Sequence, residues 1–527
     1  MTPIPGSGTS PVSLELGDLQ GGILSAYGKR GFPRGRMLLF HMEQPEAGRA
    51  FVEALRPLVT AALRWPEHVP RPDCTLNIAF TFWGLVGLDV PTRTLRAMPD
   101  PFIDGMAARA PVLGDDVGKN RISQWDNVWQ PAPSRPKPHI LVMLNASVDA
   151  SGSALPALEA MTGRVLAAAA ATQGKLWLMD GHGGPEPRWQ ELSALFADEG
   201  NGQRRPSPME HFGFVDAVGD PVFDGQYPGA EEQEKCRGQG AVDGAGNWRP
   251  LRTGEFILGW PNEGQEVAGA PMPLDFSRNG SFFAYRKLHQ DIGAWDSWIE
   301  TSARALGEAW GIAEPEQARA TLKAKMAGRW PDGIPLVRAP DWASWKAAQA
   351  RLPGMAASER MDYLTNFTFA DDPLGERCPM TAHIRRANTR DMLDPFGRQP
   401  DAKKRMGSVL NDRRRILRRG LPYGARGTGD HGIVLLAYCT DLFRQFEFVQ
   451  QQWMNYGLDF DAGNDSCPLV GAHAPGARFV IPAPDAKRPP FIAGGLPQFV
   501  ATRGGDYFFQ PSMTALRMIA QGMVDPT

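Results

Sequence analysis

The order of apolar segments constrains the fold of this chain more than any other feature of its sequence. Residues 36–181 alternate between short apolar runs, typical of strands, and longer runs with apolar residues three and four positions apart, typical of helices. The predicted order is strand, helix, strand, strand, helix, strand, which is that of a ferredoxin-like unit. The segments are Arg36–Met42, Pro45–Trp65, Thr75–Leu85, His139–Ala146, Leu155–Thr172 and Gly174–Gly181.

The same order recurs later in the chain, interrupted by one long insertion. Its predicted segments are Gly280–Leu288, His289–Gly307, Arg413–Gly420, Gly432–Thr440, Asp441–Met454 and Asp506–Pro511. The insertion spans Glu308–Asp412, and insertions of roughly a hundred residues on a rigid scaffold usually carry function. We therefore expect an α+β protein of two ferredoxin-like halves, with antiparallel sheets and peripheral helices.

The predicted organisation has three parts. Residues 1–15 are rich in Pro, Gly and Ser and are predicted to form a disordered tail. Residues 16–230 form the first half, and residues 231–527 form the second half with the insertion near 308–412. A homo-oligomer is possible, although no segment displays an interface.

Bulk composition excludes several classes of function. The net charge of −2 gives no reason to expect a nucleic-acid or membrane partner. The longest apolar runs are far short of the ~20 residues that a membrane span needs, and the N-terminus lacks the pattern of a signal peptide. Five scattered cysteines do not make a disulfide framework. We expect a cytoplasmic protein.

The stretch "MEHFGFVDAVGDPVFDG" (Met209–Gly225) holds His211 and three aspartates in an apolar, Gly-rich context. A histidine in such a run is most often a hydrogen-bonded core residue. Asp216 follows Phe212 and Phe214 closely. A carboxylate among apolar residues is costly to bury unless it is paired or has a function.

A second candidate site lies in the insertion around His383, in "CPMTAHIRRANTRD". One interpretation is a metal site made by Cys378 and His383, although a single such pair is a weak zinc signal. Another is an axial haem ligand followed by arginines for the two propionates. The third is an ordinary solvated basic turn.

The run "RRRILRRGLPYG" (Arg413–Gly424) is basic, with two apolar residues inside it. On a strand, Arg418 would lie on the face opposite Leu417 and Arg419. An inward Arg418 requires an anionic partner or a working site. Nucleic-acid binding is not favoured, because no aromatic residues are interleaved with the arginines. Dinucleotide-binding, Walker A and nucleophile-elbow motifs are absent from the sequence.

Taken together, these motifs resemble those of the dye-decolorizing peroxidases, of the larger bacterial and fungal-like branch. The resemblance covers almost the whole chain after the tail. "HFGFVDA" resembles the family's GxxDG signature, "CPMTAHIRRANTRD" its proximal haem-ligand motif, and "RILRRGLPYG" its distal-arginine motif. Three further blocks resemble the family at Leu16–Lys29, Phe102–Asp115 and Arg278–Asp291.

The resemblance implies a fold of the dimeric α+β barrel type and one haem b per chain. His383 would ligate the iron, and Arg385 and Arg386 would meet the propionates, with Arg390 as a weaker candidate. Asp465, in "GNDSCPLVG", would orient His383 through its second ring nitrogen, as carboxylates usually do.

The implied activity is the reduction of hydrogen peroxide with one-electron oxidation of dyes, phenols or other small-molecule donors. Asp216, surrounded by phenylalanines that raise its pKa, would move the proton, and Arg418 would stabilise the developing anion. Ala217 stands where the family has glycine, and Thr389 replaces the proline of its N-P-R-D motif. A haem carrier or sensor with little turnover is therefore the alternative, and a zinc protein using Cys378 and His383 is a third hypothesis.

Overall fold

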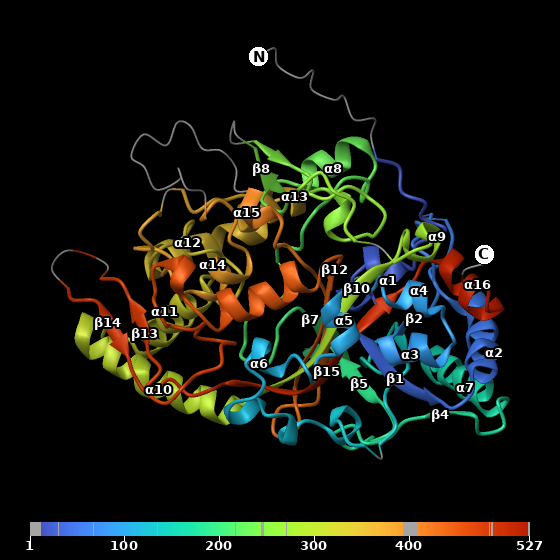
Figure 1. The fold of residues 1–527 in the computed structure, drawn as a ribbon. Helices are drawn as coiled ribbons and strands as arrows, with labels where there is room; N and C mark the ends of the chain where they lie inside the picture. The colour runs from blue at the N-terminus through green and yellow to red at the C-terminus, as the bar shows by residue number, and fades with distance from the viewer. Residues whose placement is uncertain are drawn as a thin grey trace, which may run out of the picture.

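The computed structural model describes residues 12–524, apart from 30, 67, 134, 217, 244–246, 270, 371, 394–408, 484 and 486–487. Its centre is a nine-stranded antiparallel sheet in which both predicted strand patterns meet (Figure 1). In the first set, the first strand pairs with the third and fourth, and the second pairs with the third. These strands are β1 (Arg34–Met42), β2 (Cys74–Phe80), β3 (Ile140–Ala146) and β4 (Leu176–Leu178).

The second set of strands repeats this arrangement. Its first strand, β10 (Ser281–Gln290), lies between β12 (Gly432–Cys439) and β15 (Val500–Gln510), and β11 (Leu417–Tyr423) pairs with β12 at the edge. The two sets join where Phe509 of β15 pairs with Phe80 of β2. The predicted α+β fold of two ferredoxin-like units is confirmed; the residues at which one half ends and the other begins stay a prediction.

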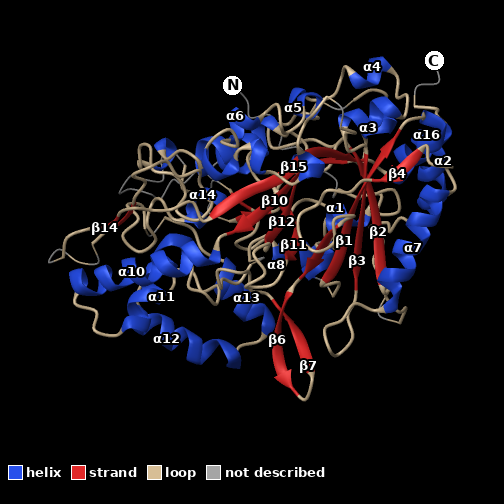
Figure 2. Cartoon of the chain, turned by 90° about the horizontal axis from the view of Figure 1, so that it is seen from below, coloured by secondary structure: helices blue, strands red, loops and turns tan. Residues whose placement is uncertain are grey.

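Helices cover the two ends of this sheet differently. Helices α2 (Pro45–Leu55), α7 (Pro156–Ala170) and α16 (Met513–Gln521) lie beside the first set of strands (Figures 1 and 2). Helices α10 (Ile292–Trp310), α11 (Pro315–Ala327), α12 (Trp342–Arg351) and α14 (His383–Ala387) gather at the opposite end. The Asp291 side chain caps α10 by accepting from the Ala294 amide, and Gly311 ends the helix in a left-handed conformation.

The remaining elements are short and lie around the sheet. Strand β5 (Gln190–Ser193) pairs with β1, and the hairpin of β6 (Leu195–Gly200) and β7 (Gln203–Ser207) projects from the body of the molecule (Figure 2). Two further pairs are β8 (Ala241–Val242) with β9 (Trp248–Arg249) and β13 (Phe479–Ile481) with β14 (Phe491–Ala493). The other helices are α1 (Gly21–Leu24), α3 (Phe82–Gly87), α4 (Thr92–Leu95), α5 (Asp100–Asp104), α6 (Ala110–Leu113), α8 (Gly229–Lys235), α9 (Leu274–Ser277), α13 (Ala357–Thr365) and α15 (Val409–Asp412).

Several predicted boundaries are wrong for identifiable reasons. The helix predicted to reach Trp65 ends at Leu55, where a 3₁₀ turn containing Pro57 follows. The strand predicted to reach Leu85 ends at Phe80, because the Thr81 hydroxyl accepts from the Gly84 amide and starts α3. Strand β11 begins at Leu417 rather than Arg413. The helix predicted at 441–454 winds as two π-helical segments, η9 (Phe443–Glu447) and η10 (Val449–Met454).

The apolar core is divided into two clusters. One fills the space around the sheet, and the other lies beneath α10, α11, α12 and α14. The second cluster contains Phe212 and Phe214 from the first half, together with Trp295 and Trp330. The inserted segment therefore has its own core, which is completed by residues that precede it and by residues that follow it in the chain. No helix in the described part of the chain is both long enough and apolar enough to cross a bilayer.

A buried ion pair links the second set of strands to a loop of the first half. The Arg286 guanidinium on β10 donates to both oxygens of Asp115, at 2.5 and 3.0 Å, and to the Thr502 hydroxyl at 2.6 Å. The side chains of Asp115 and Arg286 are 0% and 4% exposed. Removing one member leaves the other charge buried without its partner.

Substitution Asp115→Ala should therefore destabilise the fold by about 3–5 kcal/mol, the usual result of breaking a buried pair. Urea unfolding followed by circular dichroism measures this loss. Asp116→Ala, at the exposed neighbouring aspartate, is the matched control and should change stability by less than about 0.5 kcal/mol. Equal effects of the two substitutions would contradict this account of the ion pair.

A second buried carboxylate gives stability a defined pH dependence. Asp412, which ends α15 just before β11, is 3% exposed. The Arg249 guanidinium lies 3.6 Å from the Asp412 carboxylate and is shared with Glu263 at 2.8 Å. Burial, reinforced by repulsion from Glu263, raises the pKa of Asp412 to about 7.

Because the folded pKa exceeds the unfolded one, the folded state binds the extra proton, and stability falls as pH rises toward 7. Asp412→Asn should remove this component, so that the loss of unfolding free energy between pH 5 and pH 8 becomes smaller by roughly 2–3 kcal/mol. Urea unfolding of both proteins at the two pH values measures the difference. Parallel pH profiles would contradict the raised pKa.

Candidate functional site

One cavity is lined by all three residues that the sequence predicts to be catalytic or iron-binding. Its volume is about 320 Å³, and Asp216, His383 and Arg418 all line it. They come from three separate segments: the loop after β7, the start of α14 and strand β11. Apolar side chains such as Phe446, Val449 and Leu469 form much of the remaining wall.

The loop that carries Asp216 is a tight hairpin held by a buried carboxylate. The Asp216 amide donates to the Pro208 carbonyl at 2.8 Å, and the Glu210 amide donates to the Phe214 carbonyl at 2.9 Å. The Glu210 carboxylate accepts from the amides of Phe212 and Phe214, both at 2.9 Å, and from the Gln290 side chain. Burial raises the pKa of Glu210, which also lines the cavity.

His211 fastens this loop to the strand that carries Arg418. Its Nε2 lies 3.0 Å from the Tyr423 carbonyl on β11, and the ring is 4% exposed. His211 is not among the described residues that line the cavity. The histidine therefore has the structural role expected of a buried, hydrogen-bonded ring.

The Asp216 carboxylate contacts two cations. Its Oδ1 accepts from Arg418 Nη1 at 3.2 Å, and its Oδ2 lies 3.7 Å from Lys29 Nζ. The rings of Phe212 and Phe214 contact Trp295, and both residues also line the cavity that Asp216 lines. The Asp216 carboxylate therefore has cationic partners in a cavity whose wall is partly apolar.

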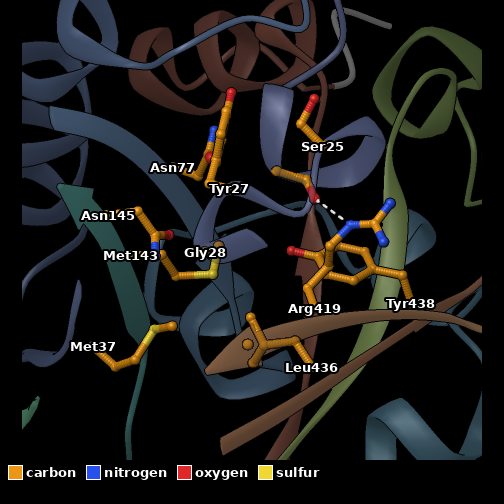
Figure 3. Close-up of a pocket in the computed structure, with 12 residues that line it drawn as sticks. Ser25, Tyr27, Gly28, Met37, Asn77, Met143, Asn145, Arg419, Leu436 and Tyr438 are labelled. Atoms are coloured by element: carbon orange, nitrogen blue, oxygen red, sulfur yellow. Dashed lines mark hydrogen bonds between the residues drawn. The ribbon is translucent and has the colours of Figure 1, made fainter. Parts of the chain in front are cut away.

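Strand β11 sets the direction of Arg418. Buried residues alternate along it, and Leu417, Arg419 and Leu421 share the face that Arg418 does not. Arg419 donates to the carbonyls of Gly22, Ile23 and Leu24, and it lies both in the wall of the cavity and in that of a second pocket of about 30 Å³ (Figure 3). Consequently Arg419 joins the strand to the first half, while Arg418 remains available to the cavity, as the strand periodicity predicted.

His383 begins α14, and its two ring nitrogens have different surroundings. Nδ1 lies 3.3 Å from the Sγ of Cys467, a fully buried thiol. Nε2 has no hydrogen-bond partner among the described residues, and the ring lines the cavity. The predicted partner, Asp465, is wrong, because its carboxylate lies 3.7 Å from Arg478 and its carbonyl accepts from Arg386. The sulfur beside His383 is also not that of Cys378, as a zinc pair would require.

Arg385 and Arg386 were predicted to contact the acidic groups of a cofactor. In the structure, their guanidinium groups form hydrogen bonds with other groups of the protein. Arg385 forms an ion pair with Asp372 at 2.6 Å and donates to the Cys378 carbonyl. Arg386 donates to the carbonyls of Thr381, Trp453, Tyr456 and Asp465. Both are 0% exposed, and neither is among the described residues that line the cavity. Their geometry overturns the prediction and gives them a structural role.

Other arginines supply the positive charge instead. Arg329 and Arg415 line the cavity, whereas Arg390 is not among the described residues that line it but lies near enough to both for their charges to interact. Arg329 Nη2 and the Nε and Nη2 of Arg390 are buried without a partner among the described residues. Burial lowers the pKa of Arg329 to about 9. Such unsatisfied donors indicate that this end of the site is built to receive an anion.

Sequence reasoning missed four of these residues for different reasons. Arg329 lies far along the chain from the motifs that it joins, and nothing local marks it. Lys29 ends the block Leu16–Lys29, but its contact with Asp216 depends on the tertiary fold. Cys467 stands two positions after the aspartate that was chosen, and a preference for carboxylates as partners of ligating histidines favoured the wrong residue. Glu210 adjoins His211, and its role depends on a backbone turn that the sequence did not reveal. Ala217, a predicted departure from the family motif, lies outside the described residues.

The chain is similar to known proteins in sequence and in fold. A family model described as "Dyp-type peroxidase, C-terminal" matches residues 367–485, the segment that holds His383, Arg418 and Cys467. A dye-decolorizing peroxidase of Exidia glandulosa is 26% identical, with 96% of this chain and 87% of the relative covered. The multifunctional dye peroxidase DyP2 of Amycolatopsis sp. is 25% identical, with 97% of each chain covered.

Solved structures extend the likeness to the fold. A dye-decolorizing peroxidase in complex with 2,6-dimethoxyphenol superposes with a TM-score of 0.67 at 22% identity, covering 96% of this chain and 100% of that one. The match therefore includes both ferredoxin-like units and the segment inserted in the second. Together with the motifs, these likenesses make the chain similar to the DyP-type, or dye-decolorizing, peroxidases over almost its whole length.

Proposed function

We propose that this protein is a haem peroxidase that reduces hydrogen peroxide and oxidises dyes, phenols or other small organic donors by one-electron steps. The observation that carries the proposal is the single cavity lined by His383, Asp216 and Arg418. A histidine with a free ring nitrogen, a carboxylate and a guanidinium are the groups that peroxide cleavage at a bound metal requires.

The residues of the cavity fit haem. His383 offers Nε2 to iron, since Nδ1 is held by Cys467. The unpartnered donors of Arg329 and Arg390, with Arg415 nearby, would hold the two propionates. The apolar wall suits the porphyrin ring. We propose one haem b per chain, with Arg329 and Arg390 rather than Arg385 and Arg386 as the partners of the propionates.

Haem iron, when bound, supplies the centre that accepts two oxidising equivalents from peroxide and passes them singly to donors. The protein's own task is to move a proton and stabilise a charge. Asp216 takes the proton from one peroxide oxygen and delivers it to the other, which leaves as water. Arg418 donates to Asp216 and stabilises the negative charge on the departing oxygen. Overall, one peroxide and two donor molecules give two waters and two donor radicals.

The donor class is inferred from the relatives. One solved relative is described in complex with 2,6-dimethoxyphenol, and another relative is named a multifunctional dye peroxidase. We propose phenols and dyes as donors for this protein. We also propose a cytoplasmic location, supported by five cysteines that are all buried and free. The division into residues 16–230 and 231–527, and a homo-oligomeric assembly, stay predictions.

Haem loading tests the assignment of the residues that hold the cofactor. Wild-type protein should bind haem more tightly than haem dimethyl ester, because the ester lacks the anionic propionates. In Arg329→Met this preference should shrink by about tenfold or more, the value of a charge-assisted hydrogen bond. Spectrophotometric titration with both forms measures it, and comparing them cancels any general destabilisation. Arg338→Met, at an exposed arginine, is the control.

The same titration examines the iron ligand. His383→Ala should shift the Soret band of the bound haem, and a spectrum identical to that of wild type would remove His383 from its role. An unchanged preference for the free acid in Arg329→Met would remove Arg329 from the propionate site without affecting the ligand assignment.

Peroxide kinetics test the two catalytic assignments. Asp216→Asn should lower kcat/KM for hydrogen peroxide by roughly 10²–10⁴-fold, because no group then moves the proton. Arg418→Leu should lower it by roughly 10²–10³-fold, as expected for a lost charge stabiliser. Oxidation of 2,6-dimethoxyphenol at varied peroxide concentration measures both. Asp224→Asn, at an aspartate that contacts Arg252 outside the cavity, is the matched control and should keep wild-type kinetics. Wild-type values for either site variant would refute its role.

A further inference from the structure

The contact between Cys467 and His383 has a consequence beyond the position of the ring. Sγ of Cys467 lies 3.3 Å from Nδ1 of His383, within the range for a hydrogen bond to sulfur. The neighbours of Cys467 form the same wall as His383: Leu469, Val470 and Met454 all line the cavity. The sulfur therefore stands directly behind the ring, on the side away from the cavity.

The backbone of Cys467 is fixed independently of its side chain. Its amide donates to the Met454 carbonyl at 2.7 Å, and its carbonyl accepts from the Gly471 amide at 3.0 Å. The same carbonyl lies 2.9 Å from Nε2 of His473. Cys467 is 0% exposed, so its side chain has no solvent to turn toward. The chain thus holds the sulfur against Nδ1 by contacts that do not involve His383.

His383 is equally constrained on its own side. It begins α14, whose Arg385 and Arg386 are anchored by the buried hydrogen bonds described above. No carboxylate oxygen competes for Nδ1 among the described residues, since Asp465 is directed to Arg478. One sulfur atom is therefore the partner of a ring whose other nitrogen faces the cavity.

We propose that Cys467 is the positioning residue of the axial imidazole and that its sulfur limits the electron donation of His383 to iron. The inference rests on the proposed function of His383 as the iron ligand. A ligating histidine usually donates its second N–H to a carboxylate, carbonyl or water, and such acceptors raise the basicity of the ring. Sulfur is a weak acceptor compared with a carboxylate. The ring in this protein is consequently less basic, and bound iron has a higher reduction potential, than a carboxylate at position 467 would give.

Cys467 could affect activity in two ways, by packing against His383 or by acting on its Nδ1, and an activity assay alone does not separate them. If Cys467 only fills space, a residue of similar size can replace it without changing the reduction potential of bound iron or the iron–histidine stretching band. A cysteine that acts through Nδ1 sets the strength of the axial bond, so replacements with different acceptor strength should move a spectroscopic property in opposite directions.

The test uses full-length protein loaded with haem. Two quantities are measured: the iron reduction potential by spectroelectrochemistry, and the iron–histidine stretching band of the reduced protein by resonance Raman scattering. Cys467→Asp should lower the potential and raise the stretching frequency, because the carboxylate is a stronger acceptor. Cys467→Ala, which removes the acceptor, should shift both quantities the opposite way.

Cys378→Ala is the matched control. Cys378 is another buried thiol near α14, 1% exposed, but its sulfur is not the one beside His383. This variant should leave potential and band unchanged. If Cys467→Asp does not fold, Cys467→Asn provides a neutral acceptor of the same shape and should shift both quantities in the direction expected for aspartate, by less.

Shifts of opposite sign for Asp and Ala at position 467, with none for Cys378→Ala, would establish the inference. Wild-type values for both variants, or shifts of the same sign, would overturn it while leaving His383 as the ligand. A protein whose haem spectrum is unaffected by His383→Ala would instead overturn the proposed function on which the inference rests.

Discussion

The hydrogen bonds of two buried arginines hold the site in place. Helix α14 has only five residues, too few for a helix to persist without tertiary contacts. Arg385 and Arg386 fasten it to Asp372, to the Cys378 carbonyl and to the backbone around residues 453–465. Burying two guanidinium groups is unfavourable unless their donors are satisfied, and here backbone carbonyls satisfy most of them. His383, at the first position of α14, is therefore fixed by side chains that do not themselves enter the cavity.

A second set of contacts brings the two halves of the chain to the same cavity. The hairpin of Asp216 belongs to the first half, and Arg418 belongs to the second, 202 positions later. Glu210 shapes the hairpin from within, and His211 attaches it to the strand of Arg418. These contacts fix the positions of Asp216 and Arg418 relative to each other. Proton transfer by a positioned group requires such a fixed geometry. The proposed chemistry depends on both halves being folded together.

The two arginine predictions show where sequence reasoning succeeds and fails. Arg418 was placed correctly because strand periodicity alone decides which face a side chain takes. Arg385 and Arg386 were misassigned because their positions after His383 suited anion binding, whereas the structure pairs Arg385 with Asp372 and the Cys378 carbonyl, and Arg386 with backbone carbonyls of a later segment. Their roles depend on contacts at 7–13 and 67–79 positions along the chain. Arg329, with its unpartnered donor, could be recognised only once the surrounding space was defined.

The sequence by itself determined the order of the main strands and helices, the two ferredoxin-like units and the choice of Asp216, His383 and Arg418 as candidate residues. These follow from local periodicity and short motifs, which depend on neighbouring residues. Tertiary structure decided that the three share one cavity, that Cys467 rather than Asp465 contacts His383, and that Arg329 and Arg390 carry the unsatisfied charge. The physical reason is that hydrogen bonding and desolvation depend on which distant groups are buried together, and no local pattern records that.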